Sequence, residues 1–397
     1  MLQILLLLLA THAAERVVTL EDALGRALEQ NPEVIALRAE LEARDAEVDQ
    51  AARLVNPELT SAVEHVGTDA SERETTTSVE QIVELGGDRR ARRDVAATTR
   101  DLARFDYASK RVEIAARVRS AFAGVLAGQE RLAIARENLK LVQDAAGAIR
   151  ERVAAGKVSP IEETRAAVAV ATERLALRRA ETELELARRR LAAAWGSDTS
   201  DFDSVAGALG VRELPPPEML HAALERHPDL ARWTSEIAER EAVVRLEQAR
   251  SVPDLRASVG HRTYESADDA ALVGGIAIPL PLFDRNRGAI AAARLRVERA
   301  REEQRAARVR LQREADEAHR RAATVAGEVE TLRTEIVPAA QSVYDAIAEG
   351  YRLGKFGYLE VLDARRVLAD ARLQLVRALE ELELARVEID RLMGVER

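Results

Sequence analysis

Two runs of apolar residues, spaced by alternating steps of four and three, flank a short glycine-containing segment at Tyr351 to Ala364. This spacing is a heptad pattern, which aligns apolar side chains along one stripe of an α-helix. Gly354 and Gly357 can adopt backbone conformations that end one helix and redirect the chain. The pattern therefore predicts an antiparallel coiled-coil hairpin with its tip near Gly354. The two stripes are Leu311, Ala315, Ala318, Ala322, Val325, Val329, Leu332 and Ile336, then Ala364, Leu368, Ala371, Leu375, Ala378, Leu382, Ala385 and Ile389.

The sequence also contains an internal duplication. The segment Ala27 to Pro32 returns as Ala223 to Pro228, 196 residues later, and Gly156-Lys157 returns as Gly354-Lys355, 198 residues later. A repeat at a fixed offset indicates one structural plan used twice. We expect a first repeat over residues 15–196, a glycine- and proline-bearing linker over 197–216 and a second repeat over 217–397.

Each repeat is expected to contain an amphipathic helix, a β-hairpin and a long helical hairpin, in that order. The longest helices would measure about 100 Å at 1.5 Å per residue, which a compact domain does not need. The fold class is therefore mainly α with a small β part. The expected helices cover residues 20–54, 88–155 and 160–195 in the first repeat and 217–251 and 286–350 in the second, where a returning helix carries the stripe Ala364 to Ile389. The expected strands cover 59–66, 75–85, 255–264 and 271–282.

The composition narrows the function. The chain has no cysteine, which excludes disulfides, thiolate metal sites and a cysteine nucleophile, and its net charge of −9 argues against nucleic-acid binding. Residues 1–14 contain the apolar run Ile4 to Ala10 followed by small residues, and this pattern predicts a secretory signal peptide. Four strands cannot close a barrel alone, so their edges favour self-association.

Together these features resemble the TolC-like outer-membrane factors, the outer membrane efflux protein family. The resemblance rests on the duplicated helix–proline starts at Asn31-Pro32 and His227-Pro228, the strand exit Ile278 to Gly288, and the tip Tyr351 to Ala364. It implies a homotrimer in the bacterial outer membrane, with one 12-stranded barrel seated in outer-membrane lipid and a helical tunnel in the periplasm. The strand exit and tip most resemble the CzcC-type heavy-metal efflux branch.

The resemblance also implies partners and site residues. The chain would be a passive duct that works with a periplasmic adaptor (membrane fusion) protein and an inner-membrane pump of the resistance-nodulation-division (RND) type. Glu360, Asp363 and Tyr351 fall on positions of the periplasmic gate, although acids in a first helical turn are also ordinary helix-stabilising residues. The tips would dock the adaptor, or serve only as turns, and comprise Gly156, Lys157, Val158, Leu353, Gly354, Lys355 and Phe356.

No catalytic motif, cofactor site or metal site is predicted, so the chain is not expected to be an enzyme. His65 and His261 occupy matched strand positions but lack neighbouring ligands at metal-binding spacing. Within the same family, a duct for drugs and other organic compounds or for type I secretion stays an alternative to metal export. A structural coiled-coil scaffold is an alternative of another class.

Overall fold

The computed structural model describes residues 16–66, 73–265 and 269–396. The expected signal peptide, residues 1–14, lies outside the described residues, as do most of the two turns that connect paired strands. The chain divides into two compact units, and each unit contains segments of both repeats. Within the described chain, unit 1 comprises residues 16–35, 110–224 and 311–396, and unit 2 comprises residues 36–109 and 225–310.

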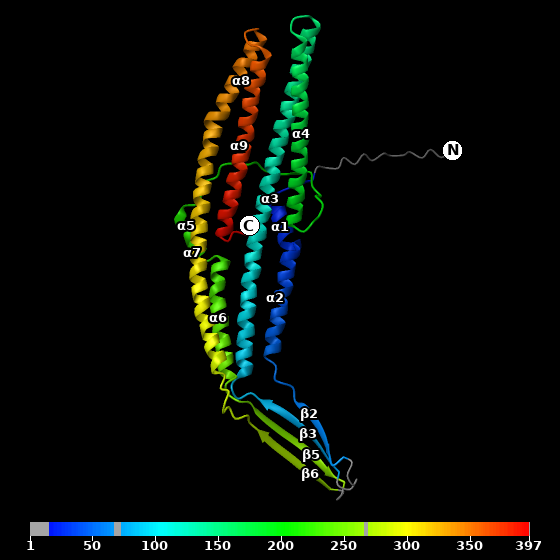
Figure 1. The fold of residues 1–397 in the computed structure, drawn as a ribbon, viewed down its shortest axis with the longest axis vertical. Coiled ribbons are helices and arrows are strands. Elements are labelled where there is room, and N and C mark those ends of the chain that lie inside the picture. The colour runs from blue at the N-terminus through cyan, green and yellow to red at the C-terminus, as the bar shows by residue number, and fades with distance from the viewer. Residues whose placement is uncertain (1–15, 67–72, 266–268, 397) are drawn as a thin grey trace, which may run out of the picture. The chain divides into compact units, whose positions relative to one another are not determined.

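Unit 2 contains one antiparallel sheet with the strand order β2-β3-β5-β6 (Figure 1). Each repeat supplies one hairpin, β2–β3 or β5–β6, as predicted, and β3 pairs with β5 to join them. Residues Leu59, Val79 and Val259 form one row across three strands. The strands are β2 Glu58–Glu64, β3 Glu74–Val83, β5 Leu255–Tyr264 and β6 Asp269–Ala277.

The two faces of this sheet differ in polarity because successive residues of a strand point to opposite sides. One face carries Leu59, Val79, Val259, Leu272 and Ile276, all exposed, with Leu272 at 84% and Ile276 at 76%. The other face carries charged side chains, where Arg262 Nη1 lies 3.0 Å from Glu74 Oε2 and Arg256 Nη1 lies 3.3 Å from Glu80 Oε1. One face of the sheet therefore exposes apolar side chains, whose contact with water is unfavourable.

The prediction of one continuous helix over residues 20–54 is wrong, because this segment forms two helices. Helix α1 (Leu20–Gln30) ends at Asn31 and α2 (Pro32–Ala51) begins at Pro32. The second repeat has the same break between α5 (Pro217–Leu224) and α6 (Pro228–Ala249). Proline disfavours helical dihedrals in the preceding residue, and Asn31 (ψ 125°) and His227 (ψ 135°) are extended.

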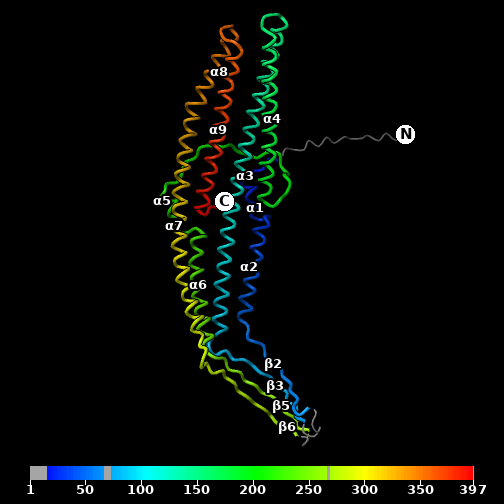
Figure 2. The backbone as a smooth tube through the Cα atoms, in the orientation of Figure 1, coloured from blue at the N-terminus to red at the C-terminus, as the bar shows by residue number. Residues whose placement is uncertain are grey.

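Unit 1 holds the tips of two helical hairpins (Figure 2). The first pairs the end of α3 (Asp88–Ala154) with α4 (Pro160–Ala194). The second pairs α7 (Arg287–Thr331) and α8 (Val337–Arg352) with α9 (Tyr358–Leu392). These bounds confirm the predicted helical hairpins to within a few residues.

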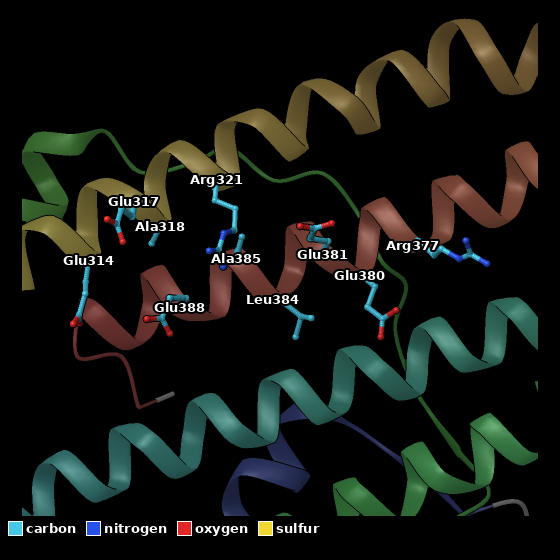
Figure 3. A pocket seen from close by; sticks show the side chains of 10 residues that line it. All are labelled: Glu314, Glu317, Ala318, Arg321, Arg377, Glu380, Glu381, Leu384, Ala385 and Glu388. Carbon is cyan, nitrogen blue, oxygen red and sulfur yellow. The ribbon is translucent and has the colours of Figure 1, made fainter.

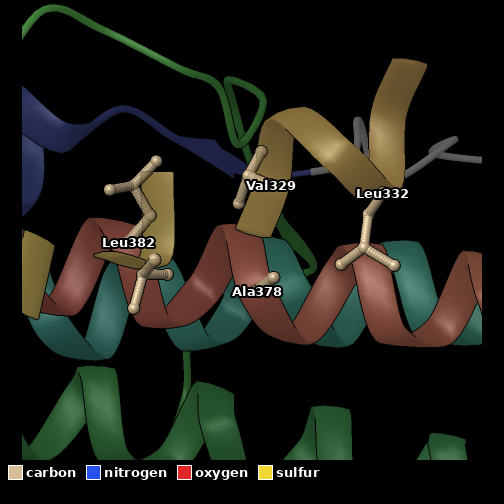
Figure 4. Close-up of a cluster of buried hydrophobic side chains, with 5 residues drawn as sticks. Val329, Leu332, Ala378 and Leu382 are labelled. Atoms are coloured by element: carbon tan, nitrogen blue, oxygen red, sulfur yellow. The ribbon is translucent and has the colours of Figure 1, made fainter. Parts of the chain in front are cut away.

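The predicted heptad stripes form the seam between α7 and α9. Leu382 and Val329 are fully buried and pack with Leu332 and Ala378 in one cluster (Figure 4). Ile336 is the exception, since 42% of it is exposed. It lies in a π-helical turn, η2 (Leu332–Ile336), which adds one residue and shifts the seam to Ala340.

The segment expected to be a linker contains a short strand that the sequence did not predict. Strand β4 (Ser204–Val205) pairs in parallel with β1 (Val17–Val18). Gln129 of α3 fixes this segment, because its side chain accepts a hydrogen bond from Val205 N (2.8 Å) and donates one to Val205 O (3.2 Å). This part of the connecting segment is therefore packed against unit 1.

Candidate functional site

The two hairpin tips of unit 1 share one local structure. Gly156 (φ +65°) and Gly354 (φ +74°) adopt the left-handed conformation that ends α3 and α8. The next residue in each tip, Lys157 or Lys355, donates its backbone N–H to a carbonyl five residues earlier at 2.8 Å. This is the Schellman pattern, which glycine allows without strain. The repeat of Gly-Lys at the two tips therefore has a backbone cause.

Tyr351 connects the second hairpin to the first. Arg152, in the last turn of α3, donates a hydrogen bond from Nη1 to the Tyr351 hydroxyl at 2.8 Å, and its guanidinium lies 5.3 Å from the centre of the Tyr351 ring. The Tyr351 and Tyr358 rings are 6.3 Å apart. Tyr358 packs with Ile149 and Ala166 of the first hairpin. Tyr351 thus belongs to a contact that would break if the hairpins separated.

Tyr358 and Arg152 were not identified from the sequence. Tyr358 is only 7% exposed, its hydroxyl has no hydrogen-bond partner among the described residues, and its burial raises its pKa. Arg152 is one of many arginines on long helices, so only its contact with Tyr351 distinguishes it. A signal for Tyr358 was available, because it begins α9 directly after Gly357.

Glu360 and Asp363 are exposed at the start of α9. Together they line an open groove of about 610 Å³ whose other walls are mostly apolar, including Val343 and Val367. Glu360 also lines a neighbouring hollow of about 340 Å³, which contains Tyr351. The structure therefore brings the three predicted gate residues to one region, with Glu360 between the other two.

The predicted docking residues divide into two groups. Val158 and Phe356 line the same 340 Å³ hollow as Tyr351, whereas Leu353 is exposed at the tip. Phe356 lies against Gly350, where a Cβ would be 2.3 Å from Phe356 Cδ2. Gly350 was not identified from the sequence, yet it creates the space for this ring. The tips therefore present apolar side chains as well as backbone turns.

The first repeat lacks the acidic pair of the second. Glu162, the counterpart of Glu360, lies 2.9 Å from Arg165, which occupies the position equivalent to Asp363. Two opposite charges at this distance neutralise one another electrostatically. Among the described residues at the two tips, the negative charge is therefore concentrated on α9.

A second charged surface, also unpredicted, lies further along unit 1 between α7 and α9 (Figure 3). It is an open groove of about 630 Å³. Arg391 binds Glu388 at 2.8 Å and lowers the pKa of that carboxyl, while Arg131 binds Glu380. Arg313 lies 2.7 Å from Glu317 and Arg391 also lies 3.9 Å from Glu314, so most of the carboxylates of the groove are paired with arginines. Its charged lining consists of Glu314, Glu317, Glu380, Glu381, Glu388, Arg321 and Arg377.

Within residues 16–66, 73–265 and 269–396, no helix has the length and apolarity needed to cross a membrane. In the same part of the chain, no three histidine, aspartate or glutamate side chains gather as a metal site would require. His261 pairs with Thr77 and Leu272 and shares the apolar face of the sheet. His65 lies just after β2, which ends at Glu64, and has a positive φ of 60°, so its predicted strand position is wrong.

Comparison with known proteins identifies the family. The model of the family "Outer membrane efflux protein" matches the chain twice, over residues 23–197 and 219–395. The chain belongs to the outer membrane efflux protein family. Its members are outer-membrane channels of multi-component efflux systems rather than enzymes, and this chain is such a channel. The two matches also explain the duplication seen in the sequence.

Individual relatives agree with this assignment. The chain is 37% identical to the cobalt-zinc-cadmium resistance protein CzcC of Cupriavidus metallidurans, over 95% of this chain and 90% of that protein. It is 30% identical to the nickel-cobalt-cadmium resistance protein NccC of Alcaligenes xylosoxydans xylosoxydans, over 70% of this chain and 64% of that protein. A membrane protein from Pseudomonas aeruginosa has the same fold, with a TM-score of 0.81 and 19% identity over 96% of this chain and 91% of that one.

Proposed function

We propose that this channel exports heavy-metal cations. The observation that carries the proposal is the 37% identity to a cobalt-zinc-cadmium resistance protein along 95% of the chain. The exposed pair Glu360 and Asp363 supports it, because carboxylates that line a passage favour cations. The cargo would cross the duct passively, since the chain belongs to a family of channels.

We further propose that three chains close one 12-stranded barrel in the outer membrane and that their helices form a tunnel in the periplasm. The sheet supports this proposal. Strands β3, β5 and β6 have 10, 10 and 9 residues, which suits a tilted membrane strand of roughly 9–11 residues. The exposed apolar face would contact lipid, the charged face would line the lumen, and β6 of one chain would pair with β2 of the next.

The proposed gate combines Tyr351 with Glu360 and Asp363. In the described conformation the Arg152–Tyr351 hydrogen bond ties the two hairpin tips together. Opening would require the hairpins to separate and this bond to break. Three copies of the acidic pair would form two rings of three carboxylates, which would attract and retain multivalent cations.

The tips are the proposed docking surface for a periplasmic adaptor, and an RND-type pump would supply the energy. The exposed side chains of Leu353 and Phe356 support this role, since apolar side chains on a tip are available for contact. Each chain would place two structurally equivalent repeats around the trimer axis, residues 15–196 and 217–397. Their connecting segment, residues 197–216, would cross between them.

A deletion strain tests the cargo. We expect sensitivity to zinc, cobalt and cadmium salts, restored by the wild-type chain, and unchanged tolerance of dyes and antibiotics. Sensitivity to organic compounds alone would refute metal export and support an organic-compound duct. A strain that fails to secrete a protein substrate, with normal tolerance of both panels, would instead indicate type I secretion.

A further inference from the structure

The sheet and the helices of unit 2 meet at one end of the strands, which we call the helix-side edge of the sheet. Strand β3 ends there at Val83, and β5 begins opposite it at Leu255. Strand β6 ends at the same edge, because Ala277 pairs with Arg256. Helix α3 starts five residues after β3, at Asp88. Side chains in the first turns of α3 therefore lie at the boundary between the sheet and the helices.

Three arginines in these turns have no charged partner. Arg89, Arg90 and Arg93 are exposed, and in the described part of the chain none of them forms an ion pair or a side-chain hydrogen bond. Arg92 differs, because it binds both carboxylate oxygens of Glu84. Many other arginines of the helices pair with a carboxylate three or four residues away. An arginine cluster without such pairs keeps its positive charge available for an anion.

The three side chains converge on one hollow. Arg89, Arg90 and Arg93 line an open concavity of about 600 Å³, together with Ala52 from the end of the preceding helical segment. Asp94 also lines it and contributes one negative charge, so its charged side chains sum to +2. The adjacent helix N-terminus adds positive potential.

Packing fixes the direction of the cluster. Ala91 is buried against Leu246 and Ala249 of α6. Arg89 and Arg93 are four residues apart and lie on one face of α3, on the side opposite Ala91. The cluster therefore points away from α6 and cannot be neutralised by the acidic residues of that helix.

Exposed apolar residues lie at the same edge of the sheet. The segment that follows β6 carries Ile278, Leu280, Leu282 and Phe283, and Phe283 is 100% exposed. Apolar side chains beside unpaired arginines match the boundary between hydrocarbon and headgroups in a bilayer. Neither feature has a partner within the described chain that would explain its exposure.

We infer that Arg89, Arg90 and Arg93 form a site for the phosphate of an anionic phospholipid headgroup. The inference rests on the proposed placement of the sheet across the membrane, which brings this edge to the membrane surface. Guanidinium groups bind phosphate oxygens through paired hydrogen bonds, and three of them surround one hollow. The bound lipid would hold the duct at a fixed depth.

Native mass spectrometry of the purified full chain tests this site. The chain, in detergent, is titrated with phosphatidylglycerol, with zwitterionic phosphatidylcholine and with inorganic phosphate. We expect the triple variant Arg89→Gln, Arg90→Gln, Arg93→Gln to lose affinity for phosphatidylglycerol by about tenfold or more, since each arginine near a membrane contributes measurably to binding of anionic lipid. Its affinity for phosphatidylcholine should be unchanged.

A matched control removes three other exposed arginines that lack ion pairs in the described chain, Arg174, Arg178 and Arg190 of α4. This control should bind phosphatidylglycerol like the wild type. The site is refuted if the Arg89/Arg90/Arg93 variant binds phosphatidylglycerol as tightly as the wild type does, or if the α4 control loses as much affinity as that variant. Displacement of the lipid by millimolar inorganic phosphate would show a free-anion site and would also overturn it.

Two measurements distinguish a failure of the lipid site from a failure of the proposed placement of the sheet in the membrane. If the lipid site is wrong but the placement is right, the triple variant still reaches the outer membrane and conducts ions, with wild-type lipid retention. If the placement is wrong, the wild-type sheet is not protected from water-soluble labels in outer-membrane vesicles. Labelling of exposed Leu272→Cys, in a chain without native cysteine, reports this directly.

Discussion

Removal of one hydroxyl at the hairpin tip should open the duct. In Tyr351→Phe, Arg152 loses the acceptor that it contacts at 2.8 Å, while the aromatic ring stays beneath its guanidinium. A hydrogen bond to a charged group contributes about 1.5–3 kcal/mol, and the partial exposure of Tyr351 favours the lower end. A loss of about 1.4 kcal/mol from the closed state would raise the open-to-closed ratio tenfold.

Single-channel recording in planar bilayers measures this ratio. We expect Tyr351→Phe to raise the open probability and Arg152→Gln to raise it by at least as much, because the glutamine also loses the cation–π contact. The double variant should behave like Arg152→Gln alone, since both substitutions remove the same bond.

Tyr358→Phe is the matched control. Its hydroxyl is buried within the same aromatic pair but has no hydrogen-bond partner in the described chain, so its removal should leave the open probability unchanged. The reasoning fails if Tyr351→Phe gates like the wild type, or if Tyr358→Phe has the larger effect.

Three further predictions concern charge, pH and packing. Glu360→Gln with Asp363→Asn should weaken block of the channel by trivalent cations, and unchanged block would contradict the gate assignment. Burial raises the pKa of Glu239 in the folded protein, so the folding free energy should become less favourable as pH rises from the unfolded carboxyl pKa, about 4.3, through the folded value. Glu239→Gln should therefore raise the melting temperature at pH 8 but not at pH 3, and circular dichroism can measure this. Leu382→Ala should cost about 2–5 kcal/mol in denaturant unfolding because Leu382 is fully buried, whereas the exposed Leu384→Ala should cost under about 0.5 kcal/mol.

The helices and strands were predictable because their patterns are local. Most residues of the heptad stripes are buried along α7 and α9, with Ile336 the exposed exception, and the predicted strands form the two hairpins. The breaks at Asn31 and His227 were also available in principle, since each precedes a proline. The π turn at Leu332–Ile336 is hidden by the heptad pattern, although Pro338 just after it cannot donate a backbone hydrogen bond and marks an irregular helix at this point.

The site was predictable only in part. Glu360, Asp363 and Tyr351 were placed by resemblance, and their sequence positions alone are compatible with ordinary helix-end chemistry. Arg152 and Gly350 depend on contacts with residues 199 and 6 positions away in the sequence, at Tyr351 and Phe356. Such contacts arise only when two hairpins, or a helix and its following turn, pack together. The β1–β4 pair also joins residues far apart in the sequence, and its two-residue strands are too short to show a periodic pattern.

The trimeric closure of the sheet is the claim on which the proposed duct depends, and cross-linking tests it most directly. The chain has no cysteine, so Val273→Cys in β6 and one cysteine in β2 would be its only thiols. Because closure of a barrel staggers its strands, the β2 cysteine is placed in turn at Glu58, Thr60, Ala62 and Glu64, which lie on the same face as Val273. We predict that a short bismaleimide joins these opposite edges between neighbouring chains and yields a covalent trimer from outer-membrane fractions, while each single-cysteine variant stays monomeric on denaturing gels. The account is contradicted if every one of these doubly substituted chains reaches the outer membrane and still runs only as a monomer.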